Sequence, residues 1–265
     1  MIYYKSDEEI EIIRRSSLLV CETHAEVAKV LRPGITTAML DAIAETYIRD
    51  KGAKPSFKGY KGYKHTLCIS INEEVVHGIP GNREIKEGDI VSIDCGVYNE
   101  GFHGDVAYTF VVGEVSEDKL FLVNTTRESL YQGIEQAVSG NRVGDIGYAV
   151  QSYCEMRKLG VVRDLIGHGV GKNLHESPEV PNFGRRGNGT TLKEGLVIAI
   201  EPMINLGTHK VKVLKDGWTI VTQDGKCSAH FEHTVVVRKN KAEILSDHKI
   251  IEEAIKFNNN INNFQ

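Results

Sequence analysis

The sequence predicts an α+β protein built from two similar halves, in which antiparallel strands are covered by helices. Residues 86–94 and residues 193–201 both run from Lys-Glu-Gly through an apolar strand to a carboxylic acid. Residues 35–52 and residues 143–160 share a helical pattern of the same length, and both end in glycine. Because these pairs keep their order along the chain, we infer a duplicated scaffold whose halves are not stable alone.

Local patterns indicate the individual elements of this scaffold. A capping-box spacing at residues 6–9 precedes a long amphipathic helix, and a second helix over residues 37–50 is stopped by Gly52. Further elements are expected as strands at about 66–72, 89–96 and 105–112, helices at about 119–138 and 144–158, and strands at about 197–204, 218–222 and 233–238. The core is expected to span about 6–238, and the Asn-rich tail at about 257–265 is expected to be frayed.

Composition predicts a cytoplasmic globular protein. The chain has 265 residues and a formal net charge of -4, and it contains no basic run that would suggest nucleic-acid binding. Its five cysteines are scattered without C-x-x-C spacing, which is typical of reduced thiols rather than of disulfides or a zinc knuckle. Residues 1–15 are charged, and no apolar run is long enough to cross a bilayer, so we expect neither a secretory signal nor a membrane span.

Two acids at the ends of apolar strands give the first indication of function. Asp94 ends the first repeated strand, Asp105 opens the next one, and a turn pattern lies between them. A hairpin centred near Asn99–Glu100 would place the two carboxylates opposite each other on one face of the sheet. They would then repel each other unless a cation or a shared proton lay between them. Two solvated hairpin acids are the simpler alternative.

The second half supplies a corresponding pair of acids and a histidine. Glu201 ends the second repeated strand, and Glu232 opens the apolar strand that follows. His168 lies between two glycines, which let the backbone approach a site closely, although an isolated histidine of this kind is more often structural. Two Asp, two Glu and one His carry four negative charges, which balance two divalent ions. The mixed oxygen and imidazole set suits Co, Mn, Fe or Zn.

The motifs around these residues resemble those of the methionine aminopeptidases of the pita-bread fold. They are NEEVVHGIP at 72–80, GFHGD at 101–105, GHGVG at 167–171, EPM at 201–203 and FEHT at 231–234. The similarity runs from about residue 6 to residue 238, and the lack of a large insertion between His175 and Glu201 resembles the type I enzymes. The resemblance implies a duplicated pita-bread fold with pseudo-two-fold halves. The implied metal ligands are Asp94, Asp105, His168, Glu201 and Glu232.

The resemblance also implies a reaction. The enzymes of this family hydrolyse the first peptide bond of chains that begin with methionine, and two divalent ions activate the attacking water. The residue matching Glu201 moves the proton from the nucleophile to the leaving amine. His175 would polarise the scissile carbonyl, and His77, its counterpart in the repeat, would contact the peptide beyond the cut.

The methionine side chain of the substrate would occupy an apolar pocket. By position, the resemblance assigns its lining to Phe57, Tyr60, Tyr63, Cys68, His77, Leu174 and Trp218. Two positions depart from the family pattern, since Leu174 stands where many relatives have Phe and His230 stands where Gln is common. The first would widen the pocket and the second would add a titratable group near the metals. Neither departure removes a ligand, so both concern selectivity.

Three alternatives are compatible with the same fold. Proline-specific aminopeptidases and dipeptidases use the same ligands but usually carry a large extra N-terminal domain. Creatinase-like enzymes work without metal, and some pita-bread proteins have lost ligands and serve as interaction modules on ribosomes or nucleic acid. The full ligand set favours a methionine aminopeptidase that removes the initiator methionine of nascent chains when the second residue is small. We expect residues 1–265 to form a single catalytic domain that is monomeric, acts near the ribosome and binds neither membrane nor nucleic acid.

Overall fold

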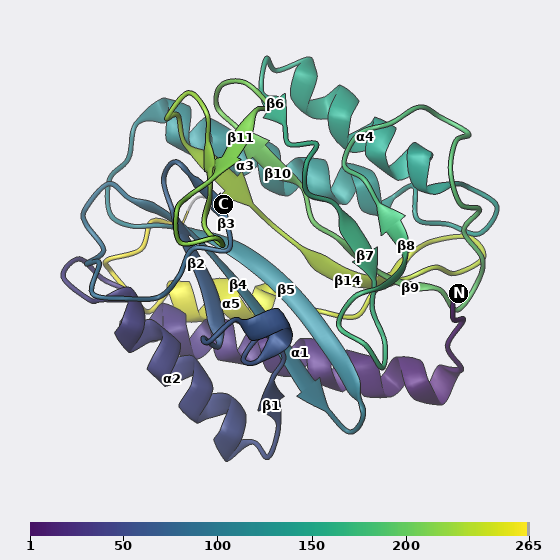
Figure 1. The fold of residues 1–265 in the computed structure, drawn as a ribbon, viewed down its shortest axis with the longest axis horizontal. Coiled ribbons are helices and arrows are strands. Elements are labelled where there is room, and N and C mark those ends of the chain that lie inside the picture. Colours follow the sequence, from purple (N-terminus) through teal and green to yellow (C-terminus); the bar gives the residue numbers. More distant parts are fainter. Residues whose placement is uncertain (264–265) are drawn as a thin grey trace.

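A computed structural model describes residues 1–263, which begin with the two predicted helices (Figure 1). Helix α1 (Asp7–Val30) starts with the predicted capping box, in which the Glu9 N–H donates to Ser6 Oγ and the Ser6 N–H donates to the Glu9 carboxylate. Helix α2 (Thr37–Asp50) has the predicted boundaries. Both expectations are therefore confirmed.

The first half is organised around a long hairpin. Strand β4 (Ile90–Asn99) pairs along its whole length with β5 (Phe102–Val111), and its other edge carries β1 (Lys54–Pro55) and β2 (Leu67–Ile71). Helix α1 packs on β4 and β5, and α2 packs on β1 and β2. The hairpin is thus buried under α1 on one face, and its other face is available to the second half.

The register of this hairpin differs from the prediction. The turn consists of Glu100 and Gly101, whose φ values of 50° and 92° are both positive, as a two-residue type I′ turn requires. Asp105 therefore pairs with Gly96 and not with Asp94, so the prediction that the two acids are directly opposed is wrong. They are diagonal neighbours on the same face, which still brings their side chains together.

The second half repeats this order of elements. Helices α3 (Glu117–Ile134) and α4 (Val143–Glu155) precede a sheet with the order β15-β14-β9-β7-β8. Its strands are β7 (Gly167–Gly169), β8 (Glu176–Val180), β9 (Val197–Ile200), β14 (His233–Val236) and β15 (Glu243–Ile244). The pair β9 and β14 corresponds to β4 and β5. Every pairing between strands is antiparallel, as expected.

Six short strands form two further sheets, with the orders β13-β10-β6 and β11-β12-β3. They are β3 (Glu74–Val76), β6 (Gly160–Val161), β10 (Met203–Asn205), β11 (Val211–Val213), β12 (Ile220–Thr222) and β13 (Ser228–His230). Strand β12 lies within the strand predicted at 218–222, whereas the sequence did not indicate β3, β6, β11 and β13. The strand predicted at 197–204 divides into β9 and β10, because Pro202 has no N–H to donate to a ladder. The interruption leaves Glu201 outside regular pairing.

The two halves are joined by hydrogen bonds at what we call the seam, where β5 meets residues 230–234. Thr109 Oγ1 donates to the His230 carbonyl over 2.7 Å, and the Glu232 N–H donates to the Ala107 carbonyl over 3.0 Å. One cluster of buried apolar side chains also extends through both halves. No helix within residues 1–263 is long and apolar enough to cross a membrane.

The C-terminal segment differs from the prediction. Helix α5 (His248–Ile255), which the sequence did not indicate, packs on α1. Asn258 is buried, and its Nδ2 donates to the Ala28 and Leu31 carbonyls, which supplies partners for the end of α1. Ile261 is also buried, so the expectation of a frayed tail is wrong for this stretch, and the core extends beyond residue 238. Residues 264–265 lie outside the described part of the chain.

A glycine at the contact between α1 and β5 provides a test of this packing. A Cβ at Gly104 would lie 2.4 Å from the Ser17 backbone nitrogen, whereas a Cβ at Gly81 would meet nothing closer than 4.0 Å. We expect Gly104→Ala to destabilise the protein by about 1–3 kcal/mol, because helix and hairpin must separate. Gly81→Ala is the matched control, and thermal unfolding of both variants checks the difference. Equal melting temperatures would contradict the close packing.

Candidate metal centre

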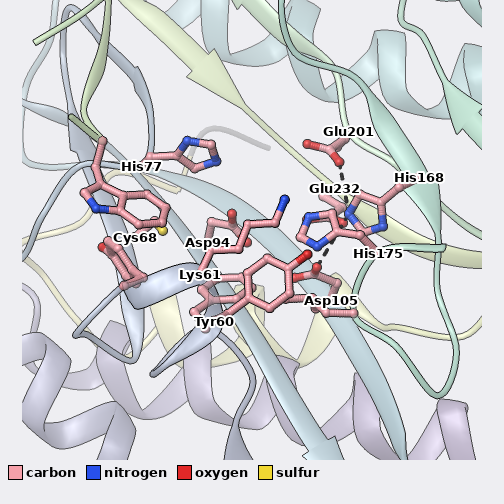
Figure 2. A pocket seen from close by; sticks show the side chains of 14 residues that line it. Tyr60, Lys61, Cys68, His77, Asp94, Asp105, His168, His175, Glu201 and Glu232 are labelled. Atoms are coloured by element: carbon pink, nitrogen blue, oxygen red, sulfur yellow. Dashed lines mark ion pairs between the residues drawn. The ribbon is translucent and has the colours of Figure 1, made fainter.

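The five predicted ligands come from both halves and meet at the seam (Figure 2). Asp94 and Asp105 project from β4 and β5, and His168 projects from β7. Glu201 directly follows β9 and Glu232 directly precedes β14, so these two acids extend the register of that strand pair beyond its end. Each half thus contributes one pair of acids from a central strand pair.

Donor atoms of Asp105, His168, Glu201 and Glu232 lie close to one another. His168 Nε2 lies 3.5 Å from Glu201 Oε1 and 3.8 Å from Asp105 Oδ2. One atom each of Asp105, His168 and Glu232 lie within 4.8 Å of one another. His168 Nδ1 is 2.9 Å from the Gly169 carbonyl, so we infer that Nδ1 carries the proton and that Nε2 presents its lone pair to the carboxylates. That tautomer is the one a metal-binding histidine needs.

Neighbouring groups compensate the charges of the four acids only in part. Burial, and then the charge of Asp94, raises the pKa of Asp105 well above its usual range, and burial followed by Asp105 does the same for Glu232. Burial likewise raises the pKa of Asp94 and of Glu201 to about 7. One carboxylate oxygen on each of Asp94, Asp105 and Glu232 is buried without a hydrogen-bond partner in the described structure. Four acids in this state fit divalent cations, which would replace the missing partners.

Close backbone packing explains why His168 lies between two glycines. A Cβ at Gly167 would lie 2.4 Å from the Ala199 carbonyl oxygen, and a Cβ at Gly169 would lie 2.5 Å from the Ser177 carbonyl oxygen. Strand β7 is therefore held so closely between β8 and β9 that only glycine fits beside His168. This close approach fixes the imidazole relative to Glu201.

Two further histidines border the centre and are uncharged at neutral pH. Burial, and then the nearby His230, lowers the pKa of His77 to about 4. Burial, followed by His168 and Lys61, lowers the pKa of His175 to about 3. The His175 ring stacks on Tyr60 with centroids 5.0 Å apart and lies 4.1 Å from the His168 ring. Neutral imidazoles can donate hydrogen bonds to a substrate without adding charge to the site.

A cavity of about 180 Å³ opens above these groups. Its apolar end is a cluster of Phe57, Tyr63, Cys68 and Leu174, against which Tyr60 and Trp218 pack. All predicted ligands and all predicted pocket residues line the cavity: Phe57, Tyr60, Tyr63, Cys68, His77, Asp94, Asp105, His168, Leu174, His175, Glu201, Trp218 and Glu232. Their individual roles remain predictions. The cavity therefore joins an acidic floor to an aromatic and aliphatic end.

One lining residue was not predicted. Lys61 reaches into the cavity from a short turn, η1 (Tyr60–Gly62), and Figure 2 shows its side chain extended between His77 and His175. Its φ of 48° is in the left-handed region, and glycines with positive φ stand on both sides of the Tyr-Lys pair. The glycines at 59 and 62 were the available signal, because they mark a tight turn that directs a side chain.

The two departures from the family pattern lie close to the centre. Leu174 is buried in the apolar end of the cavity. His230 is buried with its Nε2 3.7 Å from Glu201 Oε2, and this nitrogen has no hydrogen-bond partner in the described structure. His230 thus places a polar group near Glu201 Oε2, whereas His168 lies near Glu201 Oε1.

Comparisons with known proteins agree with this geometry. The family model of metallopeptidase family M24 matches residues 11–239. The chain is 52% identical over 246 residues to the methionine aminopeptidase of Clostridium perfringens. This alignment covers 93% of this chain and 99% of that protein. It is 49% identical over 246 residues to methionine aminopeptidase 1 of Bacillus subtilis, with the same two coverages.

Solved structures give the same result. The methionine aminopeptidase of Thermotoga maritima has a TM-score of 0.91 and 44% identity, covering 93% of this chain and 100% of that one. An X-Pro aminopeptidase of Thermotoga maritima has a TM-score of 0.74 at 21% identity over 92% of this chain and 62% of that one, which shows the shared fold alone. The chain therefore belongs to metallopeptidase family M24 and, within it, to the methionine aminopeptidases of the pita-bread fold.

Proposed function

We propose that this protein is a metal-dependent aminopeptidase that removes an N-terminal methionine when the second residue of the substrate is small. The observation that carries this proposal is the cavity, in which an acidic floor with one imidazole faces an apolar end of the size of a side chain. The names of the similar proteins support it independently. The substrate amine would lie near the acids, and the methionine side chain would lie against Tyr63, Leu174 and Trp218.

The acids and His168 would hold two divalent ions of Co, Mn, Fe or Zn. Their four negative charges support two ions, and the unpartnered oxygens of Asp94, Asp105 and Glu232 support direct coordination. When bound, such ions lower the pKa of coordinated water and polarise a carbonyl, which is the chemistry that peptide hydrolysis needs at neutral pH.

The protein's own residues would handle the proton and the carbonyl. Burial raises the pKa of Glu201 to about 7, so this carboxyl is suited to accept a proton from the nucleophile and to pass it to the leaving amine. The neutral His175 would donate a hydrogen bond to the scissile carbonyl oxygen, where negative charge develops. His77, at the Trp218 side of the cavity, would contact the peptide beyond the cut.

The biological setting is also a proposal. The apolar cluster that extends through both halves supports a single catalytic domain over residues 1–265. We expect a monomer that acts in the cytoplasm on the initiator methionine of nascent chains near the ribosome. The net charge of -4 supports the expectation that it acts without binding nucleic acid or membranes.

Metal removal should abolish activity and reveal the repulsion among the acids. An acid whose pKa is raised by folding keeps a proton that the unfolded chain releases. Metal-free protein should therefore lose stability as pH rises from the ordinary carboxyl range, near 4, towards about 7. Chelation should therefore lower the melting temperature by more at pH 8 than at pH 5.5.

Co(II) or Mn(II) should restore activity, and chelator already saturated with metal is the control. Full turnover without bound metal would exclude the proposed mechanism.

Replacement of His175 and replacement of His168 should have different effects on activity and metal content. His175→Ala should keep its metal and lose about 10²- to 10³-fold in kcat, the loss typical of a removed oxyanion donor. His168→Ala should bind less metal, because it removes a proposed ligand. Steady-state kinetics and elemental analysis of both variants check this. Identical metal loss and identical kinetics in the two variants would mean that the roles are assigned wrongly.

Substrate choice should follow the shape of the cavity. Met-Ala, Met-Gly and Met-Ser peptides should be cleaved and Met-Lys and Met-Phe peptides should not, because a displacement of the carbonyl by about 1 Å can cost about 100-fold. Norleucine should replace methionine, whereas the branched leucine should not. Leu174→Phe is the matched variant and should sharpen this preference by narrowing the pocket. Equal kcat/KM for Met-Ala-Ser and Leu-Ala-Ser in the wild type would indicate a broad aminopeptidase instead.

A further inference from the structure

We propose that the buried ion pair between Lys5 and Glu176 is a positioning device for His175, through which the N-terminal segment controls the catalytic rate. Lys5 Nζ lies 2.8 Å from Glu176 Oε2, and the two side chains are only 3% and 4% exposed. Among the ion pairs of residues 1–263 outside the candidate metal centre, this one is the most deeply buried. Glu176 directly follows His175, and the inference rests on the proposed role of that histidine.

Contacts with the second half of the chain hold the backbone of the N-terminal segment that carries Lys5. The Lys5 N–H donates to the Gly195 carbonyl over 2.8 Å, and Ile2 forms a parallel bridge with Ser177 of β8. Gly195 has a φ of 83°, and a Cβ there would lie 2.8 Å from the Lys5 carbonyl oxygen. Figure 1 shows the N-terminus near β8 and β9, two strands that are far from it along the chain. The ammonium is therefore presented from a fixed backbone.

The glutamate organises the loop that carries His175. Glu176 Oε1 accepts a hydrogen bond from the Asn173 N–H over 3.2 Å. The carboxylate also lies against Gly171, where a Cβ would be 2.5 Å from Oε1. The Gly171 carbonyl in turn accepts from the His103 N–H over 2.9 Å. One carboxylate thus sets the path of residues 170–175 between β7 and β8.

The His175 ring depends on this path. Within residues 1–263 no hydrogen bond holds its side chain, and its ring packs against the rings of Tyr60 and His168. Its position is consequently set by stacking and by the backbone that Glu176 fixes. A buried ion pair adds little stability over an apolar pair of the same volume, but it has one preferred geometry. This combination indicates that the pair serves to define geometry.

The test compares single and paired replacements in the metal-loaded, full-length protein. Lys5→Met leaves Glu176 buried and unpaired, so we expect a lower melting temperature and a kcat at least about 10-fold below wild type. Lys5→Met combined with Glu176→Met removes both charges. It should recover the melting temperature while kcat stays about 10-fold or more below wild type at unchanged metal content. This double variant also decides the matter if the single variant does not fold.

Two controls identify the route of the effect. Lys172→Met removes a lysine from the same loop, but its ion pair with Glu9 is 3.6 Å long and exposed, so kcat should not change. In a His175→Ala background, the double replacement should change kcat less than about 2-fold, because its effect passes through the missing imidazole.

The outcomes separate this inference from the proposed function. If the wild type does not cleave Met-Ala-Ser, the proposed function fails. If the wild type is active and the double variant recovers both melting temperature and kcat, the pair only stabilises the fold and the inference is overturned. An undiminished loss of kcat in the His175→Ala background would overturn it as well.

Discussion

Four carboxylates and one imidazole lie buried in the seam, and repulsion among the ionised carboxylates opposes folding. The acids come in pairs from β4 and β5 and from the ends of β9 and β14, so neither half contains the site alone. The hydrogen bonds of Thr109 and Glu232 fix the same seam. The charged centre is therefore complete only where the two halves are joined.

Charge and polarity change across the cavity in a way that suits one class of substrate. Under the proposed function, the acidic floor would bind cations and the substrate amine, and the two bordering neutral histidines would donate hydrogen bonds. The far end of the cavity is aromatic and aliphatic. Lowered pKa values at His77 and His175 and raised pKa values at Asp94 and Glu201 have the same main cause, which is burial. Burial thus suppresses charge on both kinds of group, and bound metal would restore it on the acids only.

The fold is shared more widely than the activity. The architecture does not by itself choose the substrate, because one fold can carry different activities. Under the proposed function, the side chains at the apolar end and the loops that hold them would make this choice. The loop of residues 170–175 is an example, because it carries Leu174 and His175 together and is tied to the N-terminal segment by Lys5.

Local and periodic patterns in the sequence were sufficient for several features. They predicted the capping box at Ser6, the limits of α2 and the buried strands that carry Asp94 and lead to Glu201, because helix starts and buried strands depend on nearby residues. Strand β4 extends beyond Asp94 to Asn99, and β9 ends at Ile200, so the strand ends differ from the prediction. The repeat also indicated that the acids would come in two pairs.

Features that depend on partners distant in sequence were decided only by the tertiary structure. The two-residue turn at Glu100 and Gly101 places Asp105 opposite Gly96 and not opposite Asp94. The buried Asn258 connects the C-terminal segment to the end of α1 through hydrogen bonds. The pair of Lys5 and Glu176 is separated by 171 residues and had no local signal. Hydrophobic periodicity specifies which face of an element is buried, whereas the identity of the partner on that face follows from how the whole chain packs.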